Sequence, residues 1–258
     1  MHPYQSIIRL FKHCGIDCYK FEKAKAKKIL AAEFSITSGG IISIDGFDYT
    51  ANDVFEELER DDFARRLSIN MLIWRDPVLL NCLEKNETDL REIDWWDQIR
   101  YDWRRWQIRD FISPYFAVSF NKIMGNLLNE ARFADAAAWL KILPLTDNAE
   151  DRRLALSSTR IFITDFTRLL KNLNDVTCKN HLSQLENRFS QPWSRFVNQL
   201  PDSLYHIRND LLRAMYRFTF VIRHIDSNLC RKISQQMIEV RNINPELYQK
   251  IVTHIICP

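Results

Sequence analysis

The stretch EFSITSGGIISIDGFDYT, residues 33–50, decides the fold class because it carries the β signal of the chain. β-Branched residues cluster in EFSIT and IISI, on either side of a Ser-Gly-Gly sequence at 38–40. This pattern predicts a hairpin that turns at those glycines. An Asp-Gly pair at 45–46 predicts a further turn. Three of the five glycines in the 258 residues lie in this one stretch.

The remaining sequence has the patterns of helices. Scarce glycine suits a helical chain, since glycine costs about 1 kcal/mol relative to alanine in a helix interior. Thr50 and Asp53 form a capping-box start. Prolines precede apolar-periodic runs, as at helix starts, and these prolines are Pro77, Pro114, Pro192, Pro201 and Pro245. We therefore predict a mainly α, multi-helix assembly with one small N-terminal β-hairpin.

The domain organisation follows from the position of the hairpin. We place N-terminal helices and the hairpin in residues 1–62, and an all-α helical body in residues 63–258. The boundary is soft, within residues 62–90, and one compact domain is the alternative. The stretch NLLNEARFADAAAWLKILP, residues 126–144, resembles a single helical hairpin of tetratricopeptide-type repeats. No copy follows at a fixed period, so the sequence does not predict a repeat array.

Composition and charge limit the class of protein. Apolar residues make up 46% and charged residues 27%, as in globular proteins. The sequence shows neither a membrane-spanning apolar run of roughly 20 residues nor a signal peptide, and six cysteines are scattered along it. We expect a soluble, cytoplasmic protein with reduced thiols. The net charge of +3 conceals −7 over residues 45–63 and +7 over residues 151–258. Internal compensation and an acidic partner both fit this asymmetry.

Four of the seven tryptophans lie in DWWDQIRYDWRRWQIRDF, residues 94–111. On a helical wheel the tryptophans share one face, and a second apolar stripe holds Tyr101, Ile108 and Ile112. A stacking platform for nucleic acid needs a net-positive surface, whereas four arginines here meet four aspartates. We expect a core helix that is contacted on both sides. The alternative is a partner interface at Tyr101, Ile108 and Ile112, and nucleic-acid binding ranks third.

The most patterned surface lies in SLYHIRNDLLRAMYRFTFVIRHID, residues 203–226. One face of this helix is apolar, and the opposite face carries His206, Arg213, Arg217 and His224. We predict that this basic face binds phosphates or an acidic protein. A solvated helix face is the alternative.

Arg217 and His224 have six residues between them, which is similar to the arginine-to-histidine spacing of HEPN-type ribonucleases. The resemblance implies an all-α domain in which a dimer brings two such pairs together on RNA. The more typical form of the motif has asparagine after the arginine and histidine four places later. Here Arg208-Asn209 is followed by Arg213 at the histidine position, which puts that form in doubt.

Other chemistry finds little support in the sequence. The motifs GxxxxGK[ST], GxGxxG, GxSxG and HExxH do not occur. The HCGIDC stretch at residues 13–18 lacks a second ligand pair at zinc spacing, so we predict no metal site and no cofactor. We expect a non-catalytic interaction or scaffold subunit with a protein partner or as a homo-oligomer. A nucleic-acid-binding protein that uses residues 206–224 is the alternative, and an HEPN-like ribonuclease is its more specific form.

Overall fold

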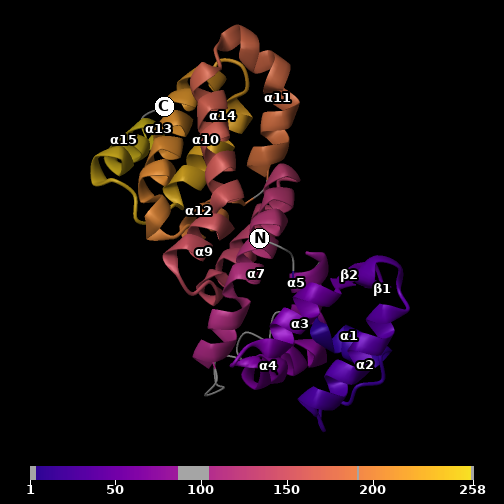
Figure 1. The fold of residues 1–258 in the computed structure, drawn as a ribbon. Coiled ribbons are helices and arrows are strands. Elements are labelled where there is room, and N and C mark those ends of the chain that lie inside the picture. Colours follow the sequence, from indigo (N-terminus) through magenta and orange to yellow (C-terminus); the bar gives the residue numbers. More distant parts are fainter. Residues whose placement is uncertain (1–3, 87–104, 191, 257–258) are drawn as a thin grey trace. The chain divides into compact units, whose positions relative to one another are not determined.

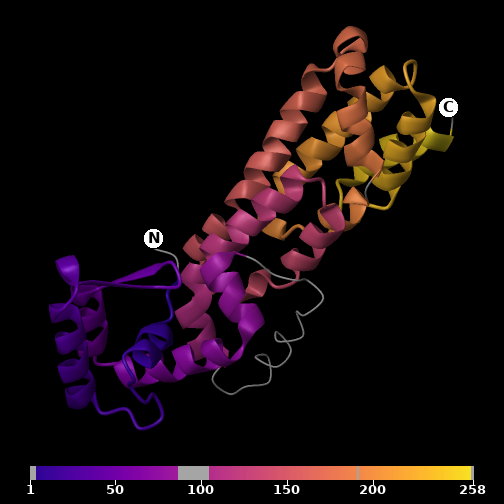
Figure 2. The same cartoon turned by 90° about the vertical axis from the view of Figure 1, so that its right-hand side faces the viewer.

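The structure is a computed structural model that describes residues 4–86, 105–190 and 192–256. Within these residues the chain forms fourteen α-helices and one two-stranded antiparallel sheet (Figures 1 and 2). The predicted mainly α class with a small N-terminal hairpin is therefore confirmed. No helix in the described part is long and apolar enough to cross a membrane. The chain divides into two compact units, an N-terminal unit of residues 1–119 and a C-terminal unit of residues 120–258.

The N-terminal unit combines short helices with the hairpin. Its elements are α1 (Ile7–His13), α2 (Lys23–Ser35), the 3-10 turn η1 (Ser38–Gly40), β1 (Ile41–Ile44), β2 (Phe47–Thr50), α3 (Ala51–Glu59), α4 (Phe63–Arg75), α5 (Pro77–Lys85) and the first part of α7 (Arg105–Asn129).

The hairpin turns at Asp45-Gly46, not at residues 38–40, so the predicted position of the turn was wrong. β1 pairs antiparallel with β2, and Ile42 lies opposite Tyr49. Positive φ angles of 53° at Asp45 and 83° at Gly46 give the backbone of a two-residue type I′ turn, whose twist matches paired strands. The Asp-Gly pair therefore sets the strand register.

The segment EFSIT was wrongly predicted as a strand, because helix α2 continues to Ser35. Ala26, Leu30 and Phe34 recur every fourth residue and are all buried. This spacing places them on one helix face, so burial of Phe34 extends the helix into the predicted strand.

Predicted helix starts in the N-terminal unit are confirmed at two positions. Thr50 caps α3, since its side-chain oxygen accepts the backbone N–H of Asp53. Asp76 caps α5 by accepting the N–H groups of Val78 and Leu79, with Pro77 at the first helical position. Each cap satisfies N–H groups that a helix leaves unpaired at its start.

Helix α7 departs from the prediction at Pro114. The predicted helix start there was wrong, because α7 begins at Arg105 and contains the proline in its interior. Proline removes one helical hydrogen bond and strains the preceding turn. Ile112 and Phe116 on either side of it are fully buried, and their packing offsets that cost.

The C-terminal unit is all-α within the described residues. It continues α7 and contains α8 (Phe133–Leu140), the 3-10 turn η3 (Leu143–Leu145), α9 (Ala149–Ala155), α10 (Ser157–Asn172), α11 (Asp175–Ser190), α12 (Trp193–Gln199), the 3-10 turn η4 (Asp202–Leu204), α13 (Tyr205–Ile222), α14 (Ser227–Ile238) and α15 (Pro245–Ile256).

Helix α13 is the centre of the C-terminal unit and is contacted by α10, α11 and α14 (Figure 1). Its buried residues include Leu211, Met215, Phe218 and Ile222, spaced by three and four as on one helix face. The helical turn predicted from residues 126–144 is also present, as α7 turns into α8 through Ala131. This core leaves the opposite face of α13 in solvent.

Candidate functional site

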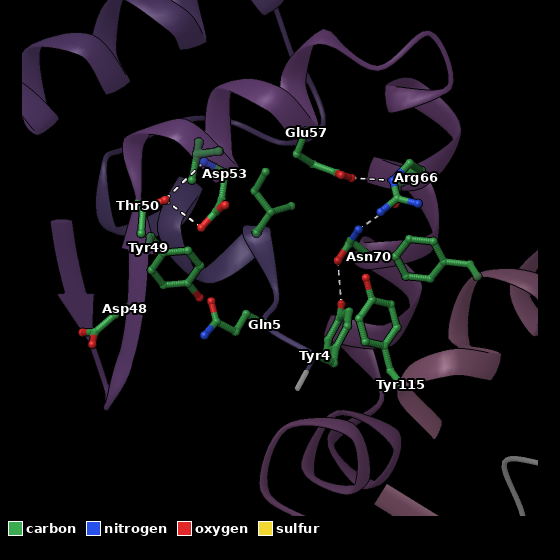
Figure 3. Close-up of a pocket in the computed structure, with 13 residues that line it drawn as sticks. Tyr4, Gln5, Asp48, Tyr49, Thr50, Asp53, Glu57, Arg66, Asn70 and Tyr115 are labelled. Atoms are coloured by element: carbon green, nitrogen blue, oxygen red, sulfur yellow. Dashed lines mark hydrogen bonds and ion pairs between the residues drawn. The ribbon is translucent and has the colours of Figure 1, made fainter. Parts of the chain in front are cut away.

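A polar cavity of about 150 Å³ lies in the N-terminal unit (Figure 3). Tyr4 donates from its hydroxyl to Asn70 Oδ1 at 2.6 Å, and the Asn70 amide donates to the backbone of Arg66 at 2.9 Å. Arg66 pairs with Glu57 at 2.5 Å and stacks over the Phe111 ring at 4.7 Å. These contacts link the N-terminal segment, α3, α4 and α7 around the cavity.

Tyr4 and Tyr49 are neutral hydrogen-bond donors at this cavity. Burial raises the pKa of both Tyr4 and Tyr49 above the ordinary value of a phenol. Tyr49 donates to the backbone oxygen of Ser6 at 3.0 Å. The polar side chains of the described lining are carboxylates, hydroxyls, amides and one guanidinium, with no cysteine, histidine, lysine or serine among them. A cavity of this size and polarity suits a few bound waters.

The predicted basic face lies on the solvent side of α13. His206, Arg213 and Arg217 are exposed on the helix, and His224 is exposed in the turn that follows it. Arg213 pairs with the exposed Asp210 at 3.2 Å. Such an exposed pair contributes about 0–1 kcal/mol, so Arg213 stays accessible but is partly neutralised.

An exposed aromatic side chain joins this face, and the sequence analysis missed it. Phe220 is 46% exposed and meets the ring of Tyr216 edge-on at 5.2 Å. Arg213, Arg217, Phe220 and His224 follow one another at intervals of four, three and four residues, the spacing of a single helix face. We call these four residues the α13 stripe. The sequence signal for Phe220 was this spacing, which places it away from the apolar face of α13.

Arg208 and Asn209 have structural roles in the C-terminal unit. Arg208 is 2% exposed and donates to the backbone oxygen of Asn242 at 2.6 Å. Asn209 accepts the backbone N–H of Asn244 at 3.1 Å and donates to the oxygen of Tyr205. Both side chains hold the loop before α15, which explains this Arg-Asn pair without an RNA site.

Two of the three residues predicted as an alternative partner interface are buried in the N-terminal unit. Ile108 is 3% exposed and Ile112 is fully buried, so both side chains pack in the core, the role we preferred for this stretch. Tyr101 and the four tryptophans of residues 94–111 lie outside the residues whose side chains the structure describes. The partner-interface prediction for Tyr101 stays a prediction.

No group of three or more potential metal-ligating side chains gathers among the described residues. Cys14 and Cys18 are unbridged and half-buried, and burial raises the pKa of both thiols. A raised pKa lowers the thiolate fraction that binds metals.

A hollow of about 370 Å³ lies between α7, α10 and α11. Its one cationic lining residue, Arg188, faces the rings of Phe162 and Phe166. The four-residue interval between the two phenylalanines predicts a shared helix face, but Arg188 comes from another helix. No local sequence pattern could therefore have identified this site.

Comparison with known proteins supplies no further assignment. No protein-family model, curated protein or solved structure matches the chain.

Proposed function

We propose that this protein is a non-catalytic interaction protein that binds an acidic surface of a partner protein through the α13 stripe. The observation that carries the proposal is that Arg213, Arg217 and Phe220 are exposed on one face of α13, with His224 exposed in the turn that follows. Arginine and aromatic side chains are enriched at protein interfaces and among the residues that dominate binding energy. A second copy of the chain is a possible partner of the same kind.

The charge of the C-terminal unit supports an acidic partner. Residues 120–258 contain nineteen lysines and arginines against thirteen aspartates and glutamates, a net charge of +6. Arg217 and Arg223 are exposed and have no carboxylate within ion-pair distance among the described residues. Complementary charge speeds association and selects partners more than it adds affinity.

The test is affinity capture with the full-length chain carrying Arg217→Glu, which reverses the charge at the centre of the stripe. Arg153→Glu on α9 is the matched control, since Arg153 is also an exposed arginine. We expect a stoichiometric protein partner that stays bound after nuclease treatment. This partner should bind the Arg153→Glu control as it binds the unchanged chain, and should bind Arg217→Glu at least about tenfold more weakly. Equal capture by both variants would contradict the proposal.

The second candidate function is nucleic-acid binding by the same stripe, with HEPN-like RNA cleavage as its more specific form. The observation in its favour is that Arg217 and His224 are both exposed and share one stripe. Binding to phosphates predicts affinity that falls steeply with salt and weakens in the Arg213→Ala/Arg217→Ala variant. Cleavage predicts RNA turnover that His224→Ala abolishes while circular dichroism stays unchanged. Nucleic acid in the captured material, with partners lost after nuclease, would favour this candidate.

A further inference from the structure

The hollow between α7, α10 and α11 has a mostly apolar wall. Ile161, Phe162, Phe166 and Leu169 line it from α10, and Gly125 lines it from α7. Ile161 is 58% exposed at this site, which leaves apolar surface in water that a ligand can cover. We call this hollow the Arg188 groove.

The rings of Phe162 and Phe166 hold Arg188 in the groove. Its guanidinium carbon lies 5.3 Å from the centre of the Phe162 ring and 5.0 Å from that of Phe166. Among the described residues it has neither an ion pair nor a hydrogen bond. The side chain is half-buried, and burial lowers the pKa of its guanidinium. Partial loss of hydration with no counter-ion is unfavourable for a cation, so a bound anion would be stabilised here.

The acidic residue in the groove does not supply that counter-ion. Asp165 pairs with Arg168 on its own helix at 2.9 Å. Both of these side chains are exposed, whereas Arg188 is half-buried. Arg188 is therefore the one cation of the described groove lining, and its five N–H donors are available to a ligand.

We propose that the Arg188 groove binds a small amphipathic monocarboxylate, with its carboxylate on Arg188 and its apolar body against Ile161, Phe162 and Leu169. A guanidinium matches a carboxylate through two parallel hydrogen bonds. The two phenylalanine rings orient the guanidinium before the ligand arrives, which lowers the entropy lost on binding. This proposal does not depend on the proposed function, because it concerns other residues and another class of ligand.

Charge favours a monocarboxylate over a phosphate. A phosphate monoester carries a charge of about −1.5 to −2 at neutral pH, and a single guanidinium leaves much of it uncompensated. Asp165 adds a further negative charge to the lining. A carboxylate of charge −1 is matched by Arg188 alone.

Size favours a small molecule over a protein segment. The volume of about 370 Å³ falls within the range of roughly 300–1,000 Å³ for small-molecule pockets. A stable protein partner typically covers about 800 Å² on each side. Such an interface is a broad surface, whereas this site is a hollow of small-molecule size.

The test is calorimetric titration of the full-length chain with three ligands that share one tail: octanoate, octan-1-ol and octylammonium. We expect saturable binding of one octanoate per chain, at least about tenfold tighter than octan-1-ol because of the charge-assisted contact. Octylammonium should bind more weakly than the alcohol. Octanoate that binds no better than octan-1-ol, or does not bind at all, overturns the proposal.

Variants locate the carboxylate at Arg188. Arg188→Gln should reduce octanoate affinity to that of octan-1-ol, while Arg160→Gln, an exposed arginine of α10 outside the lining, should leave it unchanged. Asp165→Asn should strengthen octanoate binding, since it removes a like charge. Unchanged discrimination between octanoate and octan-1-ol in Arg188→Gln overturns the assignment.

Ile161→Asp provides a second test that leaves the core intact, because Ile161 is largely exposed. The variant should weaken both octanoate and octan-1-ol, because it removes apolar surface under the shared tail, and it should weaken octanoate more, because it adds a like charge. A second copy of the chain is the other possible occupant of the groove. Light scattering measures the mass of the protein in solution. If this mass differed between the Arg188→Gln variant and the unchanged chain, and octanoate failed to bind the unchanged chain, a self-association interface would replace the ligand site.

Discussion

Arg9 connects several elements of the N-terminal unit through one side chain. Its guanidinium pairs with Glu84 at 2.5 Å and with Asp45 at 2.7 Å. It also lies over the rings of Phe47 and Trp74. Burial alone would lower the pKa of Arg9, but the charges of Glu84 and Asp45 raise it. Arg9 therefore stays cationic and holds α1, the hairpin, α4 and α5 together.

Arg9→Met is expected to lower the free energy of unfolding by about 3–5 kcal/mol, because it leaves Glu84 as a buried carboxylate without its cation. Asp45→Asn is the control and should cost less than about 1 kcal/mol, since the Asp45 side chain is 69% exposed. Urea titration followed by circular dichroism measures both.

The double variant Arg9→Met/Glu84→Gln should recover most of the loss, as glutamine still accepts the backbone N–H of Ser6 that Glu84 accepts at 3.1 Å. If Arg9→Met cost no more than Asp45→Asn, the buried pair would not be what stabilises the unit.

At the scale of an element, the hairpin depends on the backbone of its turn. Gly46 has φ of +83°, and an added Cβ would meet no atom within 4 Å. A side chain at this position therefore introduces backbone strain without steric overlap. Any loss of stability on substitution measures the cost of that conformation.

Gly46→Ala should destabilise the N-terminal unit by about 1–2 kcal/mol, the cost of a left-handed backbone for an L-residue. Gly46→Asn should lose less, because asparagine tolerates this region. Thermal unfolding compares the two variants. The type I′ assignment fails if alanine and asparagine lower the melting temperature equally.

Short-range sequence patterns predicted most of the helices, whereas contacts between residues distant in sequence set the features that the sequence did not predict. The caps at Thr50 and Asp76 and the basic face of α13 follow from spacings of a few residues. The hairpin was displaced because burial of Phe34 continues α2 through a segment with β-branched residues. Arg188 and its aromatic partners meet across two helices, and no short spacing encodes that contact.

At the scale of the molecule, each compact unit has its own buried core. The sequence predicted a division at residues 62–63, which stays a prediction about folding units. Two helix caps provide probes on the two sides of the observed division. Asp76 accepts the first N–H groups of α5, and Asp226 accepts those of Asn228 and Leu229 at the start of α14.

Asp76→Ala and Asp226→Ala should each cost about 1 kcal/mol, the usual value of an N-cap. Hydrogen exchange read by peptide mass spectrometry should show faster opening within residues 1–119 for the first variant and within residues 120–258 for the second. Faster exchange across the whole chain in either variant would show a single cooperative unit. Faster exchange across residues 63–258 after Asp76→Ala, with residues 1–62 unchanged, would favour the division at residue 62.

The pairing of Arg9 with Glu84 spans 75 residues, so during synthesis Arg9 leaves the ribosome well before its partner. At about 5–20 residues per second, the ribosome releases Glu84 roughly 4–15 s after Arg9. The N-terminal hydrogen bonds of Tyr4 to Asn70 and of Ser6 to Glu84 span 66 and 78 residues. The first helix therefore emerges with an apolar face and an unpaired arginine, and nascent-chain chaperones have those seconds in which to bind it.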